Sequence, residues 1–201
     1  LRGCPLTQAQ VTLQGLVGDR EWLVGTEDGT FITAREQPYL LCLQAEPTAD
    51  GVRLSAPDGR SVHVATAECT QTQRVEVWRD RFEAYHGAKA ADAWLSACLG
   101  QACRLYHLGA RSQRRLAEHD LPLSFADGAP YLLTNTASLQ ALNRHLARPV
   151  EMMRFRPNLV VTADFPYEED EWQRIRIGTV EFERIQPCER CVMITMDVHT
   201  G

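Results

Sequence analysis

The sequence predicts a mainly β protein with a few helices, an α+β chain whose two domains pack together. Two features of the first half indicate this. The turn dipeptides Asp28-Gly29, Asp50-Gly51 and Asp58-Gly59 recur at short intervals, and the segments between them alternate apolar and polar residues. An Asp-Gly pair supplies the positive φ of a tight hairpin, and period-two alternation buries one face of a strand. A meander or small barrel is therefore expected there.

Short strands are expected at residues 22–24, 30–33, 52–54 and 61–64. A helix is predicted between Gly87 and Gly100, because apolar residues recur there at spacings of three and four. These residues are Ala91, Trp94, Leu95, Cys98 and Leu99, and Cys98 is expected in the core. A strand should follow at 103–108. The polar, arginine-rich stretch 109–120 then indicates a loop or a domain junction. We therefore place the first domain at residues 1–108 and the second at 109–201.

The second half carries one further predicted helix, from Ala137 to Leu146. The preceding Thr134-Asn135-Thr136 offers side chains that can cap its first amides. Strands are expected at 158–161, 176–182 and 192–196. The acidic run at 168–171 is expected to be a solvated loop.

Composition excludes some classes of partner. The net charge of −5 and the pI near 5.7 argue against nucleic acid, because phosphate binding needs a clustered excess of lysine and arginine. No apolar run approaches the roughly 20 residues of a membrane span, and residues 1–15 lack the features of a secretory signal. A soluble, cytoplasmic protein with no membrane partner is therefore expected.

Basic residues are unusual in kind: Lys89 is the single lysine beside twenty arginines. Arg111, Arg114 and Arg115 crowd into one stretch. Coding bias explains such a composition without any functional demand, and a site for an anion is the alternative.

Seven cysteines form an odd set without the short-loop spacing of a disulfide scaffold, so reduced thiols are expected. They are Cys4, Cys42, Cys69, Cys98, Cys103, Cys188 and Cys191. Cys42 lies in the apolar run 40–43, where a thiol behaves as a small buried hydrophobe. We expect it to be structural.

Cys188-Glu189-Arg190-Cys191 is a C-x2-C pair after a predicted strand, and the Arg190 charge would favour a thiolate there. Three chemistries fit: half of a zinc site completed by Cys98 and Cys103, a redox dithiol, or one metal-ligating thiolate beside a bystander. The zinc interpretation is weakened because Cys98 belongs to an apolar helix face. The dithiol interpretation is weakened because a strand, not a helix, is expected next.

Two further segments could bind an anion. In Arg154-Phe155-Arg156-Pro157-Asn158, Pro157 fixes an extended turn and two guanidinium groups flank an aromatic ring, which suits a phosphate or carboxylate. Arg156 could equally be an ordinary ion-pair partner. The loop 125–130 has small residues and amides that can cradle an anion, although such loops are commonly plain turns. The histidines show no metal-binding spacing, and Ser124 has no nucleophile-elbow context.

Five motifs together resemble the MOSC family, most closely its bacterial YcbX-like and mitochondrial amidoxime-reducing-component-like members. They are Gly18-Asp19-Arg20-x-Trp22, Phe31-Ile32-Thr33-Ala34-Arg35, Ser124-Phe125-Ala126-Asp127, Phe155-Arg156-Pro157-Asn158 and Pro187-Cys188-x-Arg190-Cys191-x3-Thr195. Their order and approximate spacing match over essentially the whole chain. The resemblance implies that an N-terminal β-barrel-like domain packs on a MOSC β-barrel domain.

That resemblance implies a molybdopterin enzyme that reduces N-hydroxylated compounds, such as hydroxylamino-purines and amidoximes. Cys191 would be the molybdenum ligand and catalytic residue, with Cys188 a neighbour of undetermined role. The cofactor-binding residues carried over are Arg20, Asp127, Gly128, Ala129, Arg156, Asn158 and Arg190. Pyridoxal phosphate binding is a further family association.

The same resemblance implies an electron donor outside this chain, either a ferredoxin-like [2Fe-2S] domain fused to it or a separate reductase. Relatives carry a Lys-Ser pair before the position of Leu1 and barrel strands after that of Gly201. We therefore expect the MOSC domain to be trimmed at its C-terminus. The alternatives are a sulfur carrier or sulfurtransferase that uses a Cys191 persulfide in metal-sulfur or cofactor assembly, and a non-catalytic binding module.

Overall fold

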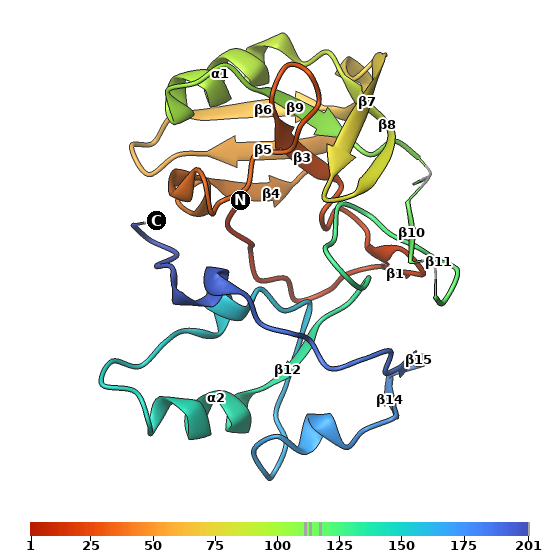
Figure 1. Cartoon of the computed structure of the whole chain (residues 1–201), viewed down its shortest axis with the longest axis vertical. Coiled ribbons are helices and arrows are strands. Elements are labelled where there is room, and N and C mark those ends of the chain that lie inside the picture. The colour runs from red at the N-terminus through yellow and green to blue at the C-terminus, as the bar shows by residue number, and fades with distance from the viewer. Residues whose placement is uncertain (111, 113, 117, 201) are drawn as a thin grey trace. The chain divides into compact units, whose positions relative to one another are not determined.

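The computed structural model describes residues 1–110, 112, 114–116 and 118–200. The chain forms two compact units: unit 1 comprises Leu1–Pro130 with Met196–Gly201, and unit 2 comprises Tyr131–Thr195. Strands predominate in the described residues, and the two α-helices are α1 (Lys89–Leu99) and α2 (Thr136–Asn143) (Figure 1). The predicted mainly β class with a few helices is confirmed.

Unit 1 is built on two antiparallel sheets (Figure 1). The larger has the order β3-β9-β8-β7, formed by Trp22–Gly25, Arg104–His107, Asp80–His86 and Gln71–Val77. The smaller has the order β4-β5-β6, formed by Gln44–Pro47, Gly51–Ser55 and Ser61–Ala65. Short hairpins join β1 (Val11–Thr12) to β2 (Gly15–Leu16) and β10 (Arg115–Leu116) to β11 (Leu121–Pro122). Within the described residues no closed ring of strands forms, although Thr30 and Phe31 make isolated bridges to Glu76 of β7 and Gly25 of β3, the two edge strands of the larger sheet.

The first core cluster of unit 1 gathers around α1. Ala91, Leu95 and Leu99 recur on one face of the helix and are buried, so the predicted helix between Gly87 and Gly100 is confirmed. Gly100 ends it in the left-handed conformation at φ 68°, which a glycine adopts without Cβ strain. Cys98 is half-buried against the same cluster.

A second core cluster brings distant segments together beside β7 and β8. Its buried residues are Val75, Val77, Phe82, Ala84, Tyr106, Leu108 and Phe125. The rings of Phe82 and Phe125 lie 5.8 Å apart between centroids, so the segment at 124–127 is held against β8. The β7–β8 hairpin itself was not among the predicted strands, because its turn contains Trp78-Arg79 and no glycine, proline or asparagine.

In unit 2, Asn135 caps α2 by accepting a hydrogen bond from the Ala137 amide at 2.9 Å, which confirms the predicted helix and capping segment. The helix ends at Asn143, earlier than Leu146. β12 (Leu133–Asn135) pairs in parallel with β13 (Leu159–Val161). β14 (Arg174–Ile177) and β15 (Val180–Glu183) form a hairpin.

Three local predictions were wrong. Residues 176–182 form a hairpin rather than one strand, because Gly178 turns the chain at φ 62°. Residues 30–33 make only isolated bridges to their neighbours. Residues 192–195 form a 3-10 helix, η5 (Val192–Thr195), instead of a strand. The stretch 109–120, predicted as a loop or a domain junction, contains the two-residue strand β10, and its role as a junction stays a prediction.

The acidic run is also more than a solvated loop. It contains the 3-10 helix η4 (Glu168–Asp170), and Glu169 accepts hydrogen bonds from Asn135 Nδ2 at 3.0 Å and Ser138 Oγ at 2.8 Å. This carboxylate therefore fixes the start of α2. Further 3-10 turns are η1 (Pro38–Leu41), η2 (Thr66–Glu68) and η3 (Met152–Phe155). No helix in the described part of the chain has the length and apolar character that crossing a membrane requires.

Buried thiols of unit 1 are structural. Cys42 is 9% exposed and its Sγ donates to the His199 carbonyl at 3.3 Å, which confirms the expected burial. Burial raises the pKa of Cys69 to about 11 and also raises the pKa of Cys103, which lies 3.7 Å from Ser96 Oγ. Among the described residues, no group of three or more His, Cys, Asp or Glu is placed to hold a metal ion.

His107 makes the stability of unit 1 depend on pH. Its ring packs against Trp22 at 4.5 Å between centroids, and its Nδ1 accepts the Gly109 amide at 3.0 Å, which leaves the proton on Nε2, 4.0 Å from Glu21. Burial lowers the pKa of His107 below its ordinary 6.5. The unfolded chain therefore binds a proton before the folded one does as pH falls below about 6.5.

We expect the free energy of unfolding to be highest above pH 6.5 and to decrease as the pH falls from there toward the lowered folded-state pKa. Urea unfolding between pH 7.5 and 5.5 measures this slope. His107→Gln keeps an acceptor and cannot ionise, so the slope should become shallower in this variant. An unchanged slope would contradict the assignment to His107.

Candidate functional site

Two of the predicted cofactor segments meet in unit 1. The Phe125 amide donates to the Arg20 carbonyl at 2.8 Å, so the motif before β3 is joined to the segment that leads into Asp127. Arg20 has a left-handed φ of 52°, and its guanidinium pairs with Asp19. Asp127 and Gly128 are exposed and Ala129 is half-buried. The predicted loop is therefore accessible beside the Arg20 segment.

Buried Arg114 holds residues 124–126, which lead into this loop, by hydrogen bonds from the interior of unit 1. The residue is 4% exposed, and its Nε donates to Asp80 Oδ2 at 2.7 Å. Its Nη1 donates to the carbonyls of Ser124 and Ala126 at 2.9 and 2.6 Å. This arginine of the arginine-rich stretch thus has a structural role. Its neighbour Arg115 pairs with Asp120, and Arg111 lies outside the described residues.

Trp78 belongs to the site although no motif in the sequence predicts it. It lies in the turn between β7 and β8, and its Nε1 donates to Asp127 Oδ1 at 3.0 Å. Its ring contacts Phe31 edge-on at 4.8 Å between centroids, and the Arg35 guanidinium carbon lies 5.0 Å from its centroid. Two motifs far apart in sequence therefore meet on a tryptophan outside both, and the sequence offered no signal for it.

In unit 2, Cys188 and Cys191 are both exposed on the segment that follows β15. Arg190 Nη1 donates to Cys188 Sγ at 3.1 Å, and Nη2 donates to the Phe155 carbonyl at 2.9 Å. The guanidinium carbon also lies 5.2 Å from the Phe155 ring centroid. The positive charge of Arg190, which we expected to favour a thiolate, is thus directed at Cys188. The thiol of Cys191, the residue that follows Arg190 in sequence, is exposed.

A second arginine joins the same two motifs of unit 2. Arg154, in η3, donates from Nη1 to the Thr195 carbonyl at 3.1 Å, at the end of η5. Together with Arg190, it ties the segment 154–158 to the cysteine motif. Arg156 follows η3 in a left-handed conformation at φ 54° and is half-buried. The structure therefore brings together the arginine and cysteine motifs that were predicted to share a ligand.

Asn158 has a structural role whatever else it does. Its side-chain Oδ1 accepts a hydrogen bond from the Leu132 backbone amide at 3.0 Å, and its own backbone amide donates to the Leu132 carbonyl at 2.8 Å. These bonds fix the start of the parallel pair β12–β13. Its predicted contact with a cofactor stays a prediction.

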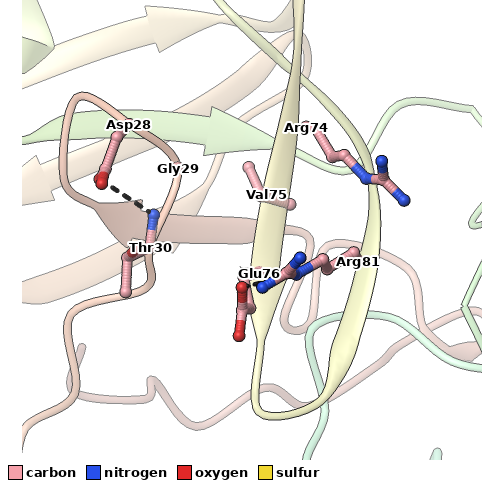
Figure 2. Close-up of a pocket in the computed structure, with 7 residues that line it drawn as sticks. All are labelled: Asp28, Gly29, Thr30, Arg74, Val75, Glu76 and Arg81. Carbon is pink, nitrogen blue, oxygen red and sulfur yellow. Dashed lines mark hydrogen bonds and ion pairs between the residues drawn. The ribbon is translucent and has the colours of Figure 1, made fainter.

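A shallow cavity of about 270 Å³ opens elsewhere in unit 1, beside β7 and β8 (Figure 2). It is lined by Asp28, Gly29, Thr30, Arg74, Val75, Glu76 and Arg81. Arg81 donates to Glu76 at 2.7 Å across its wall. None of the predicted site residues lines this cavity.

Two family models match the chain. The MOSC N-terminal beta barrel domain matches residues 1–102, and the MOSC domain matches residues 120–200. The predicted boundary at 108/109 falls in the stretch that neither model covers and stays a prediction. The two compact units divide later, after Pro130.

Individual relatives are similar along nearly the whole chain. Mitochondrial amidoxime-reducing component 1 of Homo sapiens is 30% identical over 214 residues, which span 100% of this chain and 64% of that protein. Molybdenum cofactor sulfurase of Homo sapiens is 30% identical over 98% of this chain and 25% of that protein. A solution structure from Bordetella bronchiseptica covers 51% of this chain and 89% of that one, with a TM-score of 0.38 and 18% identity.

The family models cover both halves of the chain in the order that the five motifs predicted, and the first alone covers more than half of it. The chain belongs to the MOSC family, with a MOSC N-terminal beta barrel domain followed by a MOSC domain.

Proposed function

We propose that this chain is a molybdenum-cofactor-binding oxidoreductase that reduces N-hydroxylated compounds, with Cys191 as the sulfur ligand of the metal. One observation carries the proposal: the exposed Cys191 thiol lies in a motif that Arg190 and Arg154 join to the arginine segment 154–158. Similarity to a mitochondrial amidoxime-reducing component and to a molybdenum cofactor sulfurase supports the same cofactor.

The donor set of unit 2 fits such a group. A thiolate is a soft ligand that suits molybdenum, and guanidinium groups suit the phosphate of a pterin tail. Cys191 would hold the metal, with Arg156 as the phosphate contact. Arg190 would act mainly through the cysteine motif, because its two terminal nitrogens, Nη1 and Nη2, already donate to Cys188 and Phe155. In unit 1, Arg20 and the loop 127–129 are proposed as the pterin-contacting residues.

When bound, the cofactor would supply the two-electron chemistry that cleaves the N–O bond and releases its oxygen as water. The electrons would come from a ferredoxin-like [2Fe-2S] domain or a reductase outside this chain. The residues of the chain would bind the cofactor and orient it. The accessible Cys191 thiol would supply the sulfur ligand, and the fixed segment 154–158 would orient the phosphate tail. Pyridoxal phosphate binding and a cytoplasmic location stay predictions.

A sulfur carrier is the second candidate. Its support is the similarity to human molybdenum cofactor sulfurase, at the same 30% identity as to the reducing component. An exposed thiol such as Cys191 could also hold a persulfide for delivery. The two functions use one sulfur and differ in what remains bound to it.

Expression of the full-length gene in a host that makes molybdenum cofactor separates them. The reductase should retain stoichiometric molybdenum and pterin and should reduce an N-hydroxylated base when a chemical electron donor is supplied. A protein that carries cyanide-labile sulfur without molybdenum would support the carrier. A protein with neither property would be a non-catalytic binding module.

A further inference from the structure

We propose that Trp78 is a positioning residue that holds the loop Asp127–Ala129 in place for its ligand. The role of this loop rests on the proposed function, in which its residues line the pterin. The geometry that assigns Trp78 to it lies wholly in unit 1. The bond from Nε1 to Asp127 Oδ1, at 3.0 Å, joins the turn of the β7–β8 hairpin to the first residue of the loop.

The β7–β8 hairpin holds the segment 124–127 at two separate points, one directly from Trp78 in its turn and one through Arg114 from Asp80 at the start of β8. Trp78 holds Asp127 from one side, and Asp80, two residues later, holds Arg114, which donates to the Ser124 and Ala126 carbonyls. The Arg114 guanidinium fixes residues 124–126 from the interior of unit 1. Beyond Ala126 the chain is exposed at Asp127 and Gly128. The hydrogen bond from the Trp78 indole therefore restrains Asp127, the first residue beyond those that Arg114 holds.

The indole is itself held in place. Phe31 contacts its ring edge-on, and Arg35 lies over the ring. The backbone of Trp78 has a left-handed φ of 57°, a conformation that residues other than glycine, asparagine and aspartate rarely adopt. The residue is 40% exposed, so burial in the core does not account for a tryptophan at this turn. Its contacts with Asp127, Phe31 and Arg35 do.

Trp78→Phe isolates the indole N–H. Phenylalanine keeps an aromatic face for Arg35 and an edge for Phe31, and it removes the donor to Asp127 together with one of the two fused rings, a loss of ring that Trp94→Phe shares. A matched control is Trp94→Phe, because Trp94 Nε1 is buried and has no hydrogen-bond partner within the described residues. Both variants lose one indole N–H, and only one of them loses a bond.

Backbone ¹⁵N relaxation of the full chain, without added cofactor, measures the positioning directly, because it reports the motion of exposed amides such as those of Asp127 and Gly128. In Trp78→Phe the order parameters of residues 127–129 should fall from the value of rigid backbone, about 0.85, to below about 0.6. β7 and β8 should be unchanged, and so should the loop in Trp94→Phe. Asp127→Ala should match Trp78→Phe, and the double variant should add nothing. Unchanged order parameters at 127–129 in Trp78→Phe would overturn the proposal.

Retention of molybdopterin during dialysis of the loaded protein connects this role to the proposed function. Trp78→Phe should release the pterin faster than wild type and Trp94→Phe should not. If wild type binds no pterin, the proposed function fails, while the relaxation experiment still decides whether Trp78 positions the loop. Lower order parameters at 127–129 with unchanged pterin release would overturn the part of the proposal that concerns the ligand.

Discussion

Arg114→Met is expected to lower the free energy of unfolding of unit 1 by about 2–4 kcal/mol. Methionine fills much of the same space and has no donors, so the buried carbonyls of Ser124 and Ala126 lose their hydrogen bonds. Each unsatisfied buried polar group costs roughly 1–3 kcal/mol. The ion pair with Asp80 adds less, because that carboxylate is 48% exposed and screened by water.

Arg115→Met is the matched control for this prediction. It is the same substitution one residue later, on a side chain that is 49% exposed and pairs with the exposed Asp120. Its loss should cost less than about 1 kcal/mol. Urea unfolding followed by tryptophan fluorescence compares the two variants. Equal losses from both would show that the buried contacts of Arg114 contribute no more than a surface ion pair.

Cys191→Ala is expected to reduce the molybdenum retained by the purified full-length protein by at least about tenfold, since even groups that only support a metal ligand cost 10–100-fold when removed. Cys188→Ala should stay close to wild type. The reason is the different environment of the two thiols: Cys188 Sγ accepts a hydrogen bond from Arg190, and Arg190 keeps its contacts with Phe155 when that sulfur is removed.

Elemental analysis of the two variants, prepared in parallel, measures the difference. Both positions are exposed, so neither substitution leaves a cavity in the core, and similar thermal stability is the check on folding. Molybdenum lost equally from both variants would mean that the pair acts as a unit. Loss from Cys188→Ala alone would reverse the assignment of the two sulfurs.

The sequence predicted elements whose signals are local. The helix at 89–99 has a three- and four-residue apolar repeat and a terminal glycine, and the helix at 136–143 has an asparagine cap. Strands at 51–55 and 61–65 follow Asp-Gly turns. The β7–β8 hairpin escaped prediction because its turn is stabilised by contacts of Trp78 and Asp80 with segments about 35 to 50 residues away along the chain. No local pattern encodes those contacts.

For the candidate site, the sequence identified the segments and misjudged some partners. The motif 154–158 and the cysteine motif were both recognised, and their cross-links through Arg154 and Arg190 required the fold. The crowding of arginines suggested either composition or an anion site. Arg114 is instead buried and donates hydrogen bonds to the carbonyls of Ser124 and Ala126. Only the folded loop places these carbonyls within reach of the guanidinium.

X-ray absorption at the molybdenum edge tests the central claim most directly, because it counts the sulfur atoms bound to the metal. We expect wild type and Cys188→Ser to have the same sulfur shell and Cys191→Ser, in whatever fraction still holds metal, to have lost one sulfur. An identical sulfur shell in wild type and Cys191→Ser would contradict the assignment of Cys191 as the ligand.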